Sequence, residues 1–500
     1  MPSKRSILIL AAVAFLGAAG ALLWAWRAGS APWRGPVRVL LVTLNQPAPG
    51  SGLEPGHPRA LAALVQDGLE VAGGLPVTPV SSLPANLDSL RGQSSTLILM
   101  LSPRRSGDDL GLDFRYAWGH RLGSGATIPW VEKSLPAAPP AEALQAFYQA
   151  FPHHLAAPPA ALFPRGTKTF WNLVQASAWR LQNEHLDEAL ARAAACTQEE
   201  PGCASAWVLL GNLRYRRMLD SPAVFRQEQA ETETHLRRGL ALVPAQARAA
   251  FLLSLLKTDN GDQRQALDIL VEARRLQPRN PTLLTGVAYA ARGAGLLPLA
   301  RKAMDRRDHL AFAEVQPQAL DITCLYTGEI ERFAQSLRDL PGHLRQTSGV
   351  VPFYRGYLAL VQGDKGRARE AFRQAAESSH GYPAILRLSR IFQLILEDRR
   401  DEAWTALREY DQERIGMREP DGEFTLRLAE AYALLGDRAS AMDMANRAFS
   451  RGFGCTAWYE RSPMLEPLRA LPKWQALIQH LRERQALMED RFPLSILDEG

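Results

Sequence analysis

The sequence has 500 residues, with 58 basic and 52 acidic side chains and a formal net charge of +6 at pH 7. The excess charge is mainly arginine scattered along the chain. Without a basic stripe or a recognisable nucleic-acid-binding module, this pattern excludes a nucleic-acid partner. The chain has no Walker loop, no His-Glu-x-x-His, no serine elbow and no paired Cys-x-x-Cys motifs. We therefore predict a protein that is not an enzyme and that needs neither a metal nor another cofactor.

A stretch of 20 uncharged residues, Ile7–Trp26, follows two basic residues near the start of the sequence. At the rise of an α-helix this stretch spans about 30 Å, the thickness of a membrane's hydrocarbon core. A cleaved secretory signal is the alternative. Its apolar core would be overlong, and Pro32 disfavours cleavage at the small-residue site just before it. We expect residues 1–27 to form a tail and a retained transmembrane anchor, followed by a linker at 28–36.

Both flanks of this anchor carry similar numbers of basic residues, so charge alone does not set its orientation. Small residues at Ala14, Gly17, Ala18 and Ala21 form a stripe that would let two such helices touch. An ordinary apolar sequence shows the same stripe, so the sequence gives an oligomer no further support.

The next segment, 37–157, is predicted to be a small α/β domain. Val37–Leu44 is a continuous apolar run of the kind shown by a strand buried on both faces. The polar turn at Arg104–Asp109 lies between two apolar runs and predicts a hairpin that ends in a strand at Leu110–Trp118. The remaining predicted elements are a helix at Pro58–Val71, strands at Val77–Val80 and Thr96–Leu101, and a closing helix at Ala141–Phe151.

After a linker at 158–169, one four-residue signature recurs with a 34-residue period. It consists of a small residue, a bulky one four later, a small one three later and often a proline. The signature appears as Ala189, Ala193, Cys196, Pro201; as Thr232, Leu236, Gly239, Pro244; as Ala266, Leu270, Ala273, Pro278; and as Ala368, Phe372, Ala375. Small side chains let two amphipathic helices cross closely, and proline ends the second helix. The period predicts two-helix units that start near residues 170, 204, 247, 281, 315, 349, 384 and 422. A nine-residue insertion around Leu219–Ala230 is expected to lengthen one turn.

These signatures resemble the tetratricopeptide repeat family over residues 170–455. The resemblance implies a mainly α protein: a tetratricopeptide-type α-solenoid of about eight units, preceded by the small α/β domain and one transmembrane helix. A solenoid also needs a terminal cap. We assign a cap and tail to residues 456–500, where an amphipathic run supplies Trp474, Leu477, Ile478 and Leu481.

The order of elements in 37–157, with its Arg-Arg-Ser-Gly-Asp turn at 104–108, resembles the TolB-like amino-terminal module. That module often precedes tetratricopeptide repeats in bacterial membrane-anchored regulators. The resemblance implies a single-pass protein of the cell membrane, with the bulk of the chain on the exported, periplasmic side.

First-helix positions two, five, nine and twelve of each unit usually line the concave face of such a solenoid. Here they supply amide, guanidinium and aromatic groups, which suit an extended peptide. The predicted partner-binding groove consists of Asn212, Tyr215, Arg248, Phe251, Tyr289, Arg292, Phe353 and Tyr357. Packing between helices is the alternative role for about half of them.

We therefore expect a non-catalytic, membrane-tethered scaffold that binds a peptide or protein partner. The alternative is the exported sensory half of a signalling system, in which the α/β domain binds a ligand and signals to a separate effector.

Two of the four cysteines, Cys196 and Cys203, flank a predicted turn between units. In an oxidising compartment a disulfide there would join one hairpin to the next. The alternative is that Cys196 is only the small buried residue that its repeat position requires. Cys324 and Cys455 are predicted to be lone thiols in the core.

Overall fold

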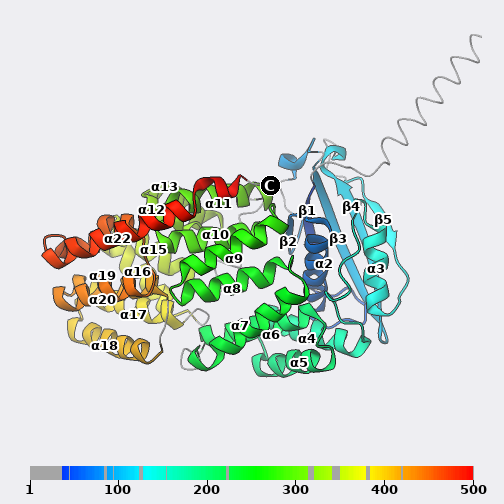
Figure 1. Ribbon diagram of the computed structural model, residues 1–500, viewed down its shortest axis with the longest axis horizontal. Helices are drawn as coiled ribbons and strands as arrows, with labels where there is room; N and C mark the ends of the chain where they lie inside the picture. Colours follow the sequence, from blue (N-terminus) through cyan, green and yellow to red (C-terminus); the bar gives the residue numbers. More distant parts are fainter. Residues whose placement is uncertain are drawn as a thin grey trace, which may run out of the picture.

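The computed structural model describes residues 37–43, 46–83, 87–93, 95–122, 128–153, 155–220, 225–312, 320–340, 349–378, 383–417 and 421–498. The predicted anchor and the linker at 28–36 lie outside these residues. Among the helices that are described, none combines the length and the apolar character needed to cross a bilayer. The described chain forms a small sheet domain followed by a long stack of helices (Figure 1).

The sheet has five strands in the order β2-β1-β3-β4-β5. β1 pairs in parallel with β2 and β3, whereas β3–β4 and β4–β5 are antiparallel. The strands are β1 (Arg38–Thr43), β2 (Val77–Val80), β3 (Thr96–Ser106), β4 (Asp109–Trp118) and β5 (Val131–Ser134). The first four confirm the predicted strands. β5 was not predicted, because three of its four residues are exposed and it has no apolar pattern.

The predicted hairpin is confirmed, because Ser106 pairs directly with Asp109 at the end of β3 and β4. Gly107, with φ +61°, lies in the two-residue turn. A positive φ favours glycine, and tight hairpin turns of this kind require it.

Both faces of the sheet are buried, which explains the unbroken apolar run of β1. One face packs against α2 (His57–Gly73), α3 (Pro140–Ala150) and the first solenoid helix, α4 (Thr167–Gln182). The other face includes Leu40, Ile98 and Met100, and Phe312 packs against it. Phe312 follows the solenoid helix α11 (Leu297–Leu310), has φ 54°, and its ring centre lies 4.2 Å from the Arg38 guanidinium. The solenoid therefore contacts both faces of the sheet.

Short 3-10 turns η1 (Asp88–Leu90) and η2 (Gly119–Arg121) complete the sheet domain. The segment predicted as a linker, 158–169, is packed rather than free. Leu162 is fully buried, and its carbonyl accepts a hydrogen bond from the Ser205 N–H at 3.2 Å.

Consecutive helices of the solenoid pack as antiparallel pairs. The first pair is α4 with α5 (Leu186–Glu199). The next three are α6 (Ala204–Asp220) with α7 (Phe225–Leu242), α8 (Ala247–Asp259) with α9 (Gln263–Leu276), and α10 (Pro281–Ala294) with α11 (Leu297–Leu310). The last four are α12 (Ile322–Thr327) with α13 (Ile330–Asp339), α15 (Val350–Val361) with α16 (Lys365–Ala376), α17 (Pro383–Leu396) with α18 (Arg400–Met417), and α19 (Gly422–Leu434) with α20 (Arg438–Ser450).

The first helices of these pairs begin close to the predicted unit starts. Four of them, at residues 204, 247, 281 and 422, begin at the predicted residue. The fifth unit differs most, because α12 begins at Ile322 rather than near 315. The nine-residue insertion does not act as predicted: it lengthens helices, since α6 and α7 have 17 and 18 residues whereas α8 and α9 have 13 and 14.

The stack curls until its last unit touches the middle ones. The Gly454 N–H donates to the Gly293 carbonyl at 2.7 Å. The remaining elements are α21 (Thr456–Arg461), η4 (Pro463–Leu468), α22 (Pro472–Arg491) and η5 (Leu494–Leu497). α22 buries Trp474, Leu477, Ile478 and Leu481, which confirms the predicted amphipathic run. The inner side of the later units is thus closed by the chain itself.

Candidate functional site

The structure divides the predicted groove residues into two groups. Asn212 and Arg248 line a small cavity between α2 and the first helices of the first three units. The other six, on α6, α8, α10 and α15, make contacts inside the stack. We call the cavity the slot; its lining is Ala63, Leu64, Asp67, Leu173, Ser177, Ser205, Val208, Leu209, Asn212, Gln246 and Arg248, and its volume is about 20 Å³.

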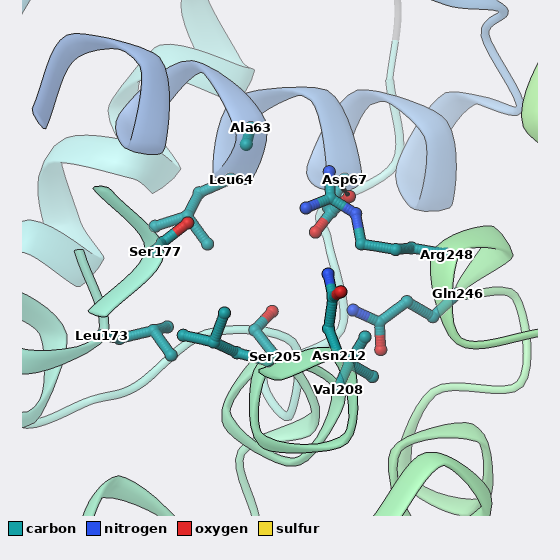
Figure 2. Close-up of a pocket in the computed structure, with 11 residues that line it drawn as sticks. Ala63, Leu64, Asp67, Leu173, Ser177, Ser205, Val208, Asn212, Gln246 and Arg248 are labelled. Carbon is teal, nitrogen blue, oxygen red and sulfur yellow. Dashed lines mark ion pairs between the residues drawn. The ribbon is translucent and has the colours of Figure 1, made fainter. Parts of the chain in front are cut away.

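Four helices and the turn before α8 shape the slot (Figure 2). α2 closes one side with Leu64 and Asp67, while α4 and α6 supply the facing side chains. Gln246 precedes α8 and is held by its backbone: its N–H donates to the Val243 carbonyl at 3.0 Å, and its carbonyl accepts from Ala249. Its side chain points into the slot toward Asn212. The slot therefore lies where the sheet domain meets the solenoid.

One end of the slot is charged. The Arg248 guanidinium lies 3.1 Å from the Asp67 carboxylate, which is almost fully buried. Burial raises the pKa of Asp67, and the charge of Arg248 partly opposes that shift. Because Arg248 is the more exposed partner, its guanidinium remains within reach of a group that enters from solvent.

The Gln246 side chain carries the clearest sign of an incomplete site. It is 2% exposed, and neither its amide nitrogen nor its amide oxygen has a hydrogen-bond partner. The Ser205 hydroxyl, also buried, has none either. A buried polar group without a partner costs about 1–3 kcal/mol, so native structures contain few of them. The slot thus offers one donor, one acceptor and a hydroxyl beside apolar walls.

A second acid of α2 ties the sheet domain to the solenoid beside the slot. Glu70 accepts hydrogen bonds from Gln66 at 2.8 Å and from Asn280 at 2.9 Å. Asn280 also caps the start of α10 by accepting from the Leu283 N–H. Burial, and then the charge of Asp67, raises the pKa of Glu70 to about 7. This junction therefore titrates near neutral pH.

Three other predicted groove residues, Tyr215, Tyr289 and Arg292, make contacts between helices of the stack. Tyr215 and Tyr289 both donate to the Asp259 carboxylate, at 2.5 and 3.0 Å. Arg292 donates to Glu423 of α19 at 3.1 Å, across 131 positions of sequence. These side chains join first helices of different units instead of facing an open trough.

Phe353, Tyr357 and Phe251 are also packed internally. Phe353 and Tyr357 are fully buried, and Phe353 packs edge-on against Phe372. Phe251 is partly buried, and a Cβ built on Gly286 would lie 3.1 Å from its ring. In this structure Phe353 and Tyr357 offer no surface to a partner.

Arg427 and Glu430 form the centre of the closed part, and sequence reasoning missed both. We call Glu430 and its four donors the Glu430 network: it accepts from Arg427 at 3.1 Å, Tyr357 at 2.5 Å, Trp458 at 3.0 Å and Ser462 at 2.7 Å. The Arg427 guanidinium also lies 4.0 Å from the Tyr357 ring. The sequence did contain a signal for this network, because Arg427 and Glu430 are two charged residues within the otherwise apolar stretch 426–433.

Of the two alternatives for Cys196 and Cys203, the structure shows no disulfide and agrees with Cys196 as a small buried residue. Both cysteines are free and buried, and their sulfur atoms face the carbonyls of Thr169 at 3.5 Å and Leu162 at 3.9 Å. Burial raises the pKa of each thiol to about 12, which leaves both unreactive at neutral pH. Cys324 and Cys455 are buried free thiols, as predicted. Within the described residues, no three His, Cys, Asp or Glu side chains gather into a metal-binding cluster.

Comparisons with known proteins give the following. No known family model matches the sequence, and no curated protein matches it. The crystal structure of yeast Tom70 is similar with a TM-score of 0.34 and 10% identity, over 67% of this chain and 66% of that one, slightly under two thirds of its length. The P58(IPK) TPR domain is similar with a TM-score of 0.18 and 12% identity, over 65% of this chain and 100% of that one. Such low scores carry no argument, so the description of the solenoid rests on its own helix pairs.

Proposed function

We propose that this chain is a non-catalytic scaffold that receives a segment of a partner protein at the slot. The observation that carries the proposal is the buried Gln246 amide, whose nitrogen and oxygen are both without partners. The N–H and C=O of a single peptide group would supply the donor and the acceptor that the Gln246 amide lacks. Asn212 and Arg248 lie in the same cavity, and both belong to first-helix positions that face the inside of a repeat stack.

The size of the slot limits what can enter it. A volume of about 20 Å³ holds about one water molecule, so the slot has room for a single small polar group of a partner and not for a separate drug-sized molecule. The bulk of the partner would therefore lie outside, against the exposed edges of α2, α6 and α8. Leu64, Leu173 and Val208 would exclude water from the part that enters.

The remaining part of the proposal concerns location. We propose that residues 7–26 tether the scaffold to the cell membrane and that the bulk of the chain lies on the exported side. The uncharged length of that segment supports the tether, and the resemblance of 37–157 to TolB-like modules supports the side. Protease treatment of intact spheroplasts tests it: digestion of the body only after lysis would contradict an exported location.

Site-specific photo-cross-linking in native membranes tests the slot. A photoreactive residue at Ser205 should capture a distinct protein, and Gln246→Leu should remove that adduct while the melting temperature is kept. The matched control is the same photoreactive residue at Leu487, which is 72% exposed on α22, far along the chain from the slot. Equal adducts at both positions, or adducts that survive Gln246→Leu, would refute the proposal.

A further inference from the structure

The segment Phe492–Asp498, here called the strap, follows α22 and lies against α9 and α11. Figure 1 shows this red end of the chain beside α11, whose residues lie about 190 positions earlier in the sequence. The strap touches neither the slot nor any residue of the Glu430 network that the structure describes. What holds it can therefore be considered separately from the proposed function.

Two apolar anchors fix the strap. Phe492 is 4% exposed and Leu497 is 0% exposed, and both join the core formed by α9, α10 and α11. The residues between them are mostly exposed, including Leu494 at 45%. Phe492 and Leu497 are thus the fully buried contacts, five positions apart, and Ile496 packs partly exposed against the same core. Short linear segments commonly bind a helical surface through such spaced apolar side chains.

Cations of α9 and α11 bind the polar groups of the strap. Arg274 donates to the Ile496 carbonyl at 2.6 Å, and Arg306 donates to the Leu497 carbonyl. Lys302 donates to the Asp498 carboxylate at 2.5 Å. These contacts recognise backbone carbonyls and one acid, so they require no further feature of this particular segment.

The strap is joined to the rest of the chain by the mostly exposed end of α22. Between Leu481 and Phe492 no side chain of α22 is fully buried, although Met488 packs against the α9–α11 core and Arg491 pairs with Asp268 of α9 at 2.8 Å. A segment with few buried contacts opens locally at lower free energy than the core. The receiving surface, by contrast, is part of the packed helix pairs α8–α9 and α10–α11. The strap therefore occupies a surface that packed helix pairs form, at the end of a helix with no fully buried side chain after Leu481.

We propose that this α9–α11 surface is a docking site for a partner segment with an aromatic residue, a leucine five positions later and an acid directly after it. The strap occupies the site in cis, and a partner of that chemistry displaces it. Charge complementarity selects the acid-ended segment, because Arg274, Lys302 and Arg306 all face the same end of the strap.

The test uses a full-length chain with a protease cleavage sequence inserted between Arg491 and Phe492. After cleavage and removal of the severed strap, a labelled peptide of residues 488–500 should bind saturably in fluorescence anisotropy. The intact chain should bind it at least about 100-fold more weakly, because a tethered competitor acts at roughly millimolar effective concentration. Peptides with Phe492→Ala or Leu497→Ala should lose at least about tenfold in affinity.

Charge reversal separates docking from nonspecific binding. Lys302→Glu should weaken the peptide about tenfold, and a peptide carrying Asp498→Lys should restore binding to that variant. Lys365→Glu, on the exposed side of α16, is the matched control and should change nothing. Absence of saturable binding to the cleaved, folded chain, or charge reversal without rescue, would overturn the proposal.

Two further outcomes also count against it. If the cleaved chain unfolds, the strap is a part of the core that the fold requires and not a displaceable segment. A concentration-dependent dimer of the intact chain that Lys302→Glu abolishes would assign the trans occupant to a second copy. Hydrogen exchange of the uncut chain gives an independent check, since the strap should exchange faster than α9 and α11.

Discussion

The slot and the Glu430 network both place polar side chains inside a repeat stack, but they differ in how those groups are satisfied. In the slot, both amide atoms of Gln246 and the hydroxyl of Ser205 are without partners. In the later units, Glu430 accepts from an arginine, a tyrosine, a tryptophan and a serine. A buried polar group that already has partners stabilises the fold, whereas one without partners costs free energy until a partner reaches it. This difference is why we propose closure for the network and binding for the slot.

The largest expected effect is at the network. Glu430→Ala leaves the Arg427 guanidinium buried with its main carboxylate removed, and breaking a buried ion pair costs about 3–5 kcal/mol. Denaturant unfolding should show this loss. Glu370→Ala removes a carboxylate that pairs with Arg373 on the exposed side of α16, and it should cause no measurable change. Equal effects of the two substitutions would mean that the network does not close the stack.

Ser462→Asp should come next. The Ser462 hydroxyl donates to Glu430 at 2.7 Å, so an aspartate there places two carboxylates together in a buried site. We expect a loss of about 2–3 kcal/mol at neutral pH that shrinks toward pH 5 as one carboxyl takes up a proton. Ser462→Ala, which removes only the hydrogen bond, should cost about 1 kcal/mol at every pH. Identical pH profiles for the two variants would contradict this explanation.

The junction beside the slot should respond to pH. The pKa of Glu70 rises from 4.5 to about 7 on folding, so the folded state binds more protons between these values. The resulting stabilisation is present below about pH 4.5 and is lost as the pH rises through 7. Glu70→Gln should remove this loss and raise the free energy of unfolding at pH 8 by about 2 kcal/mol.

Denaturant titrations from pH 5 to pH 8 measure that difference. Glu142→Gln on the exposed side of α3 is the matched control, and its profile should follow the unsubstituted chain. Acids that do not interact with Glu70 cancel in the comparison, whereas the charge of Asp67 raises the pKa of Glu70 and is part of the measured difference. A Glu70→Gln profile that is parallel to the original would show that this carboxyl does not titrate between the folded and unfolded states.

Gln246→Leu should have the smallest effect on stability and a large effect on partner capture. Removing two unpaired polar atoms from a buried site leaves the free energy of unfolding within about 1 kcal/mol of the original or raises it. Thermal unfolding and cross-linking from Ser205, measured on the same preparation, separate the two roles. A loss of several kcal/mol would show that the Gln246 amide has partners in solution and that the slot is an ordinary core site.

Local spacing was enough to predict most of the elements, although not β5 or the start of α12. The 34-residue period placed the first helices at residues 204, 247, 281 and 422, where they begin, because the crossing of two helices depends on residues within one unit. Alternation and turn chemistry likewise predicted the β3–β4 hairpin. Of the candidate site, the repeat positions predicted Asn212 and Arg248. Gln246 precedes its helix and Asp67 belongs to a different domain, so no repeat rule pointed to either.

The curvature of the stack was decided only by the tertiary structure. By itself the sequence determined that two-helix units follow a small α/β domain, since each helix carries its own pattern of small and apolar residues. Whether the inner side stays open depends on contacts between distant units, such as Arg292 with Glu423, and on Phe312 reaching back to the sheet. Those contacts depend on how far each unit is rotated relative to the one before it. Small differences in this rotation add up over many units, and the sequence of one unit does not determine the total.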